Sequence, residues 1–243
     1  MKIRHLIPAL LVLLPLCGGA MEPAEPNGKA VFQSSKFHVI QVQVEYVEMS
    51  HEILTHLLFL AENKTSDATA LRKQVQEMVA RNEATVIETQ MIAGKSGQKT
   101  SLQSNGEVIY PTEYDARPVC GAYTPNPGPL SLVPLAYDTR NCGSTLEIES
   151  TLSDDGKLVY LHLQPDLTWH TGNTRWLDVK DTAGSNLSRD MPDFYALRFD
   201  TVVSCAKGRY LMAAVLSPKD AKGVCDMTRK VMVFVKCDVL SDP

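Results

Sequence analysis

The sequence has little of what marks a membrane span or a nucleic-acid binder. Aromatic residues make up only 7% of the 243 residues, and charged residues make up 21%. After the first 16 residues no apolar run reaches the roughly 18 residues of a membrane helix. Lys and Arg number 24 against 28 Asp and Glu, so there is no basic excess to favour nucleic acid. We therefore expect no nucleic-acid partner and no membrane span in the mature chain.

Catalytic and metal-binding motifs are also lacking. No serine lies in a Gly-x-Ser-x-Gly frame, and neither Asp-Thr pair, at 138–139 or 200–201, precedes the glycine of a paired-aspartate protease loop. The Gly-Lys-Ser-Gly at 94–97 lacks phosphate-loop spacing. His51 and His56 are five apart on an expected helix, so they point in different directions and cannot share a metal. We expect no catalytic, cofactor-binding or metal-binding residue, and a protein that is not an enzyme.

Cysteines are present, but none lies in a Cys-x-x-Cys or another metal-type spacing. One lies in the apolar start of the chain, at position 17. The other five are disulfide candidates whose pairing the sequence leaves open: Cys120, Cys142, Cys205, Cys225 and Cys237. Because five is odd, at least one of these thiols is free or pairs between chains.

The first 20 residues have the pattern of a secretory signal peptide. Lys2 and Arg4 precede an apolar run at 6–16, and small residues at 18–20 offer a cleavage site. A lipid anchor on Cys17 is the alternative, but Leu16 stands where such signals carry a small residue. Residues 21–35 read as a flexible leader. We expect an exported protein, periplasmic or associated with the outer membrane.

Periodicity predicts one α+β domain over residues 36–243. A long N-terminal strand alternates at 37–49, and two amphipathic helices follow, the first capped by Ser50 and the second by Ser66 or Asp67. The remainder predicts a mainly antiparallel series of strands. A proline-rich stretch at 115–135 predicts a mobile loop, and residues 171–190 are loop-like.

One expected hairpin resembles a known family. Arg-Asn-Cys-Gly at 140–143 leads into alternating Leu146 and Ile148, an Asp-Gly turn and a second apolar strand, which resembles the secretin homology domain of type II and type III secretion systems and type IV pili. Other blocks follow in the family's order. The residues that match its motifs are Glu48, Gly97, Gln98, Gly143, Asp155, Gly156, Arg198, Thr201 and Gly208.

The resemblance implies a secretin-like fold, and it also has departures. The closing strand reads Met-Ala-Ala-Val at 212–215 where pore-forming secretins have Leu-Gly-Gly-Leu, and we expect no N-terminal ring-building modules. Charged residues on or beside the hairpin, such as Glu147, Glu149 and Asp166, do not suit a lipid-facing wall. We therefore expect the fold without the pore.

Three functions remain open. The first is a non-enzymatic structural or interaction component of the envelope, with secretion or pilus proteins, or further copies of the chain, as partners. The second is a secreted binding or adhesion module that uses Trp169 and Trp176 in a Thr/Gly/Asn-rich loop, or the proline-rich loop. The third is an enzyme of unfamiliar design, for which no residue stands out.

Overall fold

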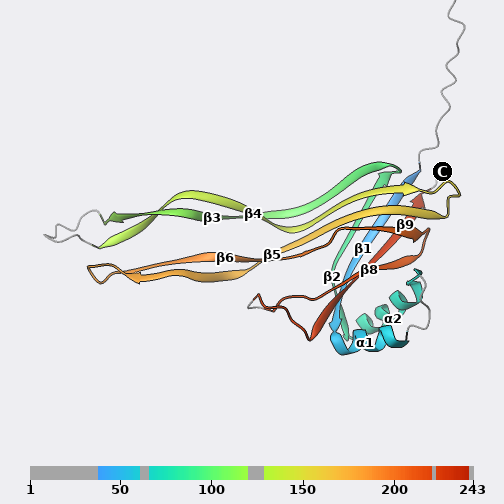
Figure 1. The fold of residues 1–243 in the computed structure, drawn as a ribbon, viewed down its shortest axis with the longest axis horizontal. Coiled ribbons are helices and arrows are strands. Elements are labelled where there is room, and N and C mark those ends of the chain that lie inside the picture. The colour runs from blue at the N-terminus through green and yellow to red at the C-terminus, as the bar shows by residue number, and fades with distance from the viewer. Residues whose placement is uncertain (1–37, 61–65, 120–128, 221–222, 241–243) are drawn as a thin grey trace, which may run out of the picture. The chain divides into compact units, whose positions relative to one another are not determined.

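The computed structural model describes residues 38–60, 66–119, 129–220 and 223–240 (Figure 1). They all belong to one compact unit, Phe37–Pro243. The expected signal peptide and leader, Cys17 and Cys120 lie outside the described residues. Two helices and mainly antiparallel sheets make up the fold, as the sequence predicted.

The first sheet has four strands in the order β2-β1-β9-β8. The bounds are β1 Val39–Ser50, β2 Ala84–Lys95, β8 Tyr210–Leu216 and β9 Arg229–Leu240, and every pair is antiparallel. β1 and β9 are the central strands, and each contributes side chains to two cores, one on either face of the sheet. Phe234 packs with the helices, whereas its neighbours Val233 and Val235 face the second sheet.

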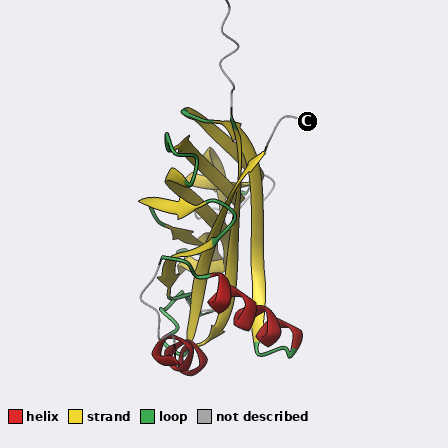
Figure 2. Cartoon of the chain, turned by 90° about the vertical axis from the view of Figure 1, so that its right-hand side faces the viewer, coloured by secondary structure: helices red, strands yellow, loops and turns green. Residues whose placement is uncertain are grey.

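Two helices cover one face of this sheet (Figure 2). Helix α1, His51–Leu60, begins directly after β1, and the Ser50 Oγ accepts the Ile53 N–H at 3.2 Å as the expected cap. Helix α2, Thr69–Ala80, has no side-chain cap at its first turn. The Asp67 carboxylate nevertheless accepts the Thr69 N–H at 2.9 Å just before that turn.

The second sheet has the order β3-β4-β5-β6, with β7 also paired to β5. Its strands are β3 Gln98–Pro118, β4 Leu130–Leu152, β5 Leu158–Lys180, β6 Asn186–Arg198 and β7 Thr201–Ala206. Leu146 and Ile148 of β4 and Leu161 and Leu163 of β5 are buried in the core cluster that also holds Ile40 of the first sheet. The predicted 146–163 hairpin is therefore one wall of the main core.

Two stretches expected to be loops are strand instead. Residues 115–118 end β3, residues 130–135 begin β4, and β5 and β6 extend through most of 171–190. Proline is tolerated here because the strands lie at free edges: next to Pro134, β4 pairs with β3 alone among the described strands. Of the expected 115–135 loop, residues 120–128 lie outside the described part.

Candidate interaction surface on the long hairpins

The second sheet divides into two hairpins at Gly143. Pairing between β4 and β5 runs from Leu152–Val159 to Gly143–Thr168. Beyond that point β4 pairs with β3 and β5 pairs with β6, and the two ribbons continue as separate hairpins (Figure 1). We call the described parts of residues 106–142 and 169–196 the outer hairpins. None of their described residues is fully buried.

The outer hairpins contact each other through aromatic and cationic side chains. The rings of Tyr110 on β3 and Phe194 on β6 lie 5.8 Å apart, and the Arg140 guanidinium lies 5.7 Å from the Phe194 ring centre. Nearer the tips, Arg189 lies 5.3 Å from the Tyr114 ring centre and also donates to the carbonyl of Leu132. These contacts hold the β3–β4 hairpin and the β5–β6 hairpin against each other as two layers.

A backbone hydrogen bond also joins the two hairpins near their tips. The Leu130 N–H donates to Asp181 Oδ2 at 2.9 Å. This bond from Leu130, followed by those from Ser185, holds the pKa of the Asp181 carboxyl below its usual range. Asp181 is thereby kept as an anion that fixes both its own turn and the start of β4.

Apolar side chains lie exposed along the outward face of the β3–β4 hairpin. Val133, Leu135 and Tyr137 alternate along β4, and Ile109 of β3 pairs with Thr139, the next residue on that face. Leu135 is 54% exposed and Tyr137 is 61% exposed. We call these four apolar residues the apolar stripe. Apolar side chains gathered in this way are typical of a surface that another molecule covers.

The outer hairpins also have unpaired strand edges. β3 and β6 end the order of the second sheet, and past the division at Gly143 the inner edges of β4 and β5 pair with no described strand. A two-stranded ribbon is marginally stable on its own, and its free N–H and C=O groups are ready to pair with another chain. The apolar stripe and the free edges together form a surface suited to association.

The point of division holds two of the expected motif residues. Gly143 has φ +142°, and a Cβ at that position would lie 2.1 Å from the Ser104 carbonyl oxygen. Arg198 pairs with Asp166 at 2.8 Å, and Gly143, Arg198 and Asp166 line one polar hollow of about 400 Å³. A glycine is thus needed at position 143, where the backbone of the paired strand β3 comes closest, and this role is structural.

The other motif residues lie in turns or at strand ends. Gly97 has φ +77° between β2 and β3, and its N–H donates to the Ser150 carbonyl at 2.8 Å. Asp155 accepts the Ser153 hydroxyl at 2.6 Å, a bond that lowers the pKa of the Asp155 carboxyl. The remaining members are Gln98 at the start of β3, Gly156 in the β4–β5 turn, Thr201 at the start of β7, Gly208 in the β7–β8 turn, and Glu48 of β1 in an ion pair with Arg229. The structure does not gather them into one site.

The two tryptophans lie on a strand, not in the expected loop. Both belong to β5. Trp169 stacks on Tyr195 with ring centres 5.4 Å apart and an interplanar angle of 18°, whereas Trp176 is 67% exposed. The pairing of β5 with β6 shifts register at His170–Gly172 and at Arg175–Leu177, so the strand continues through bulges across the polar stretch.

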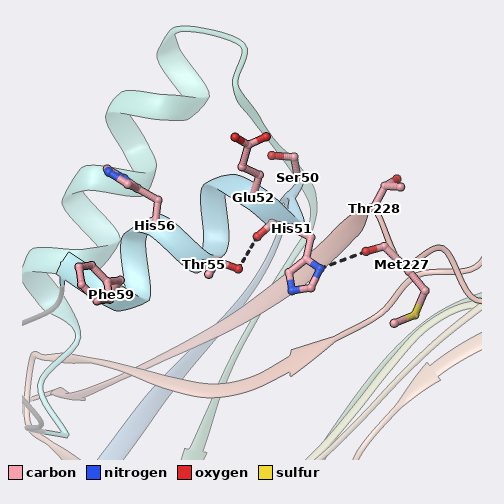
Figure 3. A pocket seen from close by; sticks show the side chains of 8 residues that line it. All are labelled: Ser50, His51, Glu52, Thr55, His56, Phe59, Met227 and Thr228. Carbon is pink, nitrogen blue, oxygen red and sulfur yellow. Dashed lines mark hydrogen bonds between the residues drawn. The ribbon is translucent and has the colours of Figure 1, made fainter.

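A shallow hollow of about 770 Å³ lies beside α1 (Figure 3). The His51 Nδ1 lies 3.2 Å from the Met227 carbonyl oxygen, while the His56 ring lies farther along the helix and faces away from it (Figure 3). Phe59 lines the hollow and is largely exposed. Because the two histidine side chains point in different directions from the helix, they do not lie together as a pair of metal ligands in this hollow.

One histidine–carboxylate pair lies on an open strand face. His162 Nε2 is 2.7 Å from Asp200 Oδ1, and the Gln164 amide donates to the other oxygen of Asp200 at 2.7 Å. These two contacts, the one from Gln164 first, lower the pKa of the Asp200 carboxyl. Within the described residues, no group of three His, Cys, Asp or Glu side chains is placed to hold a metal ion. In the same part of the chain, neither helix has the length and apolar character needed to cross a bilayer.

Three of the solved structures that resemble this chain are secretins. InvG, the secretin of the Salmonella SPI-1 type III secretion injectisome, is 9% identical over 85% of this chain and 66% of its own, with a TM-score of 0.41. The type II secretin GspD of enteropathogenic Escherichia coli is 12% identical over 85% and 69%, with a TM-score of 0.38. The Vibrio cholerae type IV competence pilus secretin PilQ is 10% identical over 85% and 58%, with a TM-score of 0.36.

The resemblance expected from the motifs agrees with these matches, and it concerns the fold alone. The chain spans about two thirds of the length of the first two of these secretins and 58% of the length of the third. No protein-family profile matches the sequence. A search of curated proteins finds no match either.

Sequence patterns had pointed to turn residues and tryptophans and missed the outer hairpins. The signal for the apolar stripe was present, because Val133, Leu135 and Tyr137 alternate in the sequence. The nearby prolines favoured the prediction of a loop over that of a strand, since proline usually ends a strand.

Proposed function

We propose that this chain is an exported, non-enzymatic, secretin-like component of the cell envelope that works in protein secretion or type IV pilus machinery. Its work is structural: the outer hairpins associate with further copies of the chain or with other envelope proteins. The export step rests on the signal-peptide pattern of residues 1–20. The link to secretion or pili rests on the order of the family motifs between Glu48 and Gly208.

The observation that carries the proposal is the pair of long ribbons that leave the core with unpaired edges and the apolar stripe. A strand of 21 or 23 residues is much longer than the core of this sheet requires, because the buried residues of β4 all lie between Ser144 and Ser150. A long strand whose residues are not buried is unfavourable in an isolated chain. Ordering each residue has a cost in conformational entropy, and burial has to offset that cost. Association would bury the stripe and pair the edges.

A non-enzymatic role is supported by the placement of the polar groups. The His162–Asp200 pair lies on an open face, and the Arg198–Asp166 pair crosses between neighbouring strands next to the structural Gly143. In both pairs the polar side chains bond to each other, and these bonds help to hold the strands of the second sheet together. His162 lines one hollow, and Arg198 and Asp166 line another.

Size-exclusion chromatography with light scattering tests the association. The full chain, exported and purified from the envelope, is measured in buffer and in mild detergent, beside Leu135→Glu and the control Val202→Glu. Val202 is 74% exposed and lies on β7, outside the outer hairpins. We expect an oligomer for the parent chain and for Val202→Glu, and a shift to monomer for Leu135→Glu. A parent chain that is monomeric under both conditions would overturn self-association.

A binding role for the tryptophans has weaker support. Trp169 is occupied by its stacking on Tyr195, so Trp176 alone presents a free aromatic face. A glycan array with the parent chain and Trp176→Ala addresses it: a hit that disappears in the variant would favour a binding module over the structural role.

A further inference from the structure

Two buried cysteines meet where the two sheets pack together. Cys205 is on β7, which pairs with β5 in the second sheet, and Cys237 is on β9, a central strand of the first sheet. Cys205 is 1% exposed and Cys237 is 0% exposed, and both belong to the main core cluster. Each thiol is the largest influence on the pKa of the other. The chain therefore brings one cysteine from each sheet into the same core cluster.

The backbone around this pair is fixed from several sides. The Gly208 N–H donates to the Cys237 carbonyl at 2.8 Å, which ties the turn after β7 directly to Cys237. The Lys207 N–H donates to the Lys157 carbonyl at 2.9 Å, and some Cα atoms of β7 and β9 approach within 8 Å. A disulfide requires Cα atoms roughly 4.4–6.8 Å apart. Two cysteines on strands that approach this closely, both inside one core cluster, are therefore candidates for such a link.

The two thiols of the folded pair differ in pKa. Its hydrogen bond with Cys237 lowers the pKa of the Cys205 thiol, while the same bond, together with burial, raises the pKa of the Cys237 thiol. The thiolate is the nucleophile in thiol–disulfide exchange. In the folded chain Cys205 is therefore the more acidic of the two thiols.

The other described cysteines are placed differently. Cys142 lies in β4 beside the point of division and is partly exposed, and Cys225 is exposed in the segment before β9. Neither belongs to the core cluster that holds the pair.

We propose that Cys205 and Cys237 form a disulfide that joins the two sheets covalently. One of the two thiolates attacks a disulfide of the oxidant, which is a dithiol–disulfide oxidase of the export compartment or oxidised glutathione in solution, and one oxidant sulfur leaves as a thiol. The other thiolate then attacks the mixed disulfide at the first cysteine's sulfur and releases the second oxidant thiol. The two cysteines lose two electrons and two protons, and the oxidant disulfide is reduced to two thiols. Since both sulfurs are buried in the folded chain, the reaction takes place during folding.

Peptide mapping tests the pairing directly. The purified full chain, refolded with oxidised and reduced glutathione, is blocked with N-ethylmaleimide and digested with trypsin without reduction. Cys205 lies in peptide 199–207 and Cys237 lies in peptide 237–243. We expect these peptides as one linked species, two hydrogens lighter than their sum, which separates on reduction. Both peptides recovered with N-ethylmaleimide attached, or either one linked to another cysteine, would overturn the proposal.

Thermal unfolding gives a second readout with matched variants. Reduction is expected to lower the Tm of the parent chain by roughly 5–15 °C, because the link closes a loop of about 30 residues. The double variant Cys205→Ala/Cys237→Ala is expected to show no change with reductant, and Cys142→Ala is expected to keep the full effect. A parent Tm that is insensitive to reductant would contradict the link. Since both tests use the purified chain, their outcome is independent of whether the proposed envelope role is correct.

Discussion

Arg72 of α2 and Glu45 of β1 form an ion pair inside the helix-covered side of the first sheet, with Nη2 and Oε2 2.5 Å apart. Their side chains are 10% and 6% exposed. The guanidinium also lies 5.9 Å from the ring centres of Tyr210 and Phe234, and the Tyr210 hydroxyl donates to Glu45 at 3.3 Å. This pair fixes α2 to the sheet by charge as well as by apolar packing.

Replacing Arg72 with Met is expected to lower the free energy of unfolding by about 3–5 kcal/mol, because Glu45 is left as a buried charge without its partner. The double variant Arg72→Met/Glu45→Leu is expected to recover much of that loss, since neither charge remains. Arg81→Met removes the exposed pair with Glu83 just after the end of the same helix and should change little. Urea unfolding of the four proteins measures this, and a loss with Arg81→Met equal to that of Arg72→Met would contradict the role of burial.

Gly143→Ala is expected to destabilise the chain by at least about 2 kcal/mol, because φ +142° is strained for any other residue and the new Cβ meets the Ser104 carbonyl. Gly156→Ala is the matched control. Gly156 has φ +68°, and nothing lies within 4 Å of an added Cβ. Gly156→Ala should therefore lower the free energy of unfolding only by the backbone strain, about 1 kcal/mol. Urea unfolding compares the two, and equal losses would show that the close approach at Gly143 has no effect.

The sequence predicted the elements whose pattern is local. Alternation in β1 and the apolar spacing of Leu71, Val75 and Val79 in α2 correspond to the observed strand and helix. The outer hairpins could not be predicted in the same way, because their prolines and glycines signal loops locally. Pro134 is tolerated only because β4 has no described neighbour on its other side there, and the bulge at Gly172 lets β5 continue. These are properties of strand order, which one sequence does not reveal.

The candidate surface was missed for the same reason. The pattern of Leu135 and Tyr137 predicts a strand face, but whether that face is covered depends on which strands lie opposite it. The meeting of Cys205 and Cys237 is likewise a tertiary fact, since they lie 32 positions apart on different sheets. The sequence offered five candidate cysteines and no basis for choosing a pair.

Arg189→Ala is expected to loosen the tips of the outer hairpins. The variant loses the hydrogen bond to the Leu132 carbonyl and the contact with the Tyr114 ring. Because a hydrogen bond from a charged donor contributes roughly 1.5–3 kcal/mol, amides of residues 130–136 should exchange at least about tenfold faster. The matched control is Arg175→Ala, which removes an exposed pair with Asp190 on one hairpin only. Hydrogen-exchange mass spectrometry measures both, and unchanged exchange at 130–136 in Arg189→Ala would contradict the link between the two layers.

Asp226 is expected to make stability depend on pH in the acid range. Hydrogen bonds from the Thr228 hydroxyl, at 2.6 Å, and from the Arg229 side chain, at 2.7 Å, lower the pKa of its carboxyl from 3.8 to about 2. Since the folded pKa lies below the unfolded one, the contribution is full above about pH 4 and is lost as pH falls toward 2. Asp226→Asn has no carboxyl to protonate, so the gap in urea midpoint between parent and variant should narrow between pH 5 and pH 2. Thr228→Val removes the strongest of these donors and should confine the loss to a narrower range just below pH 4. A gap that stays constant from pH 5 to pH 2 would show that the bonds to Asp226 do not stabilise the folded chain.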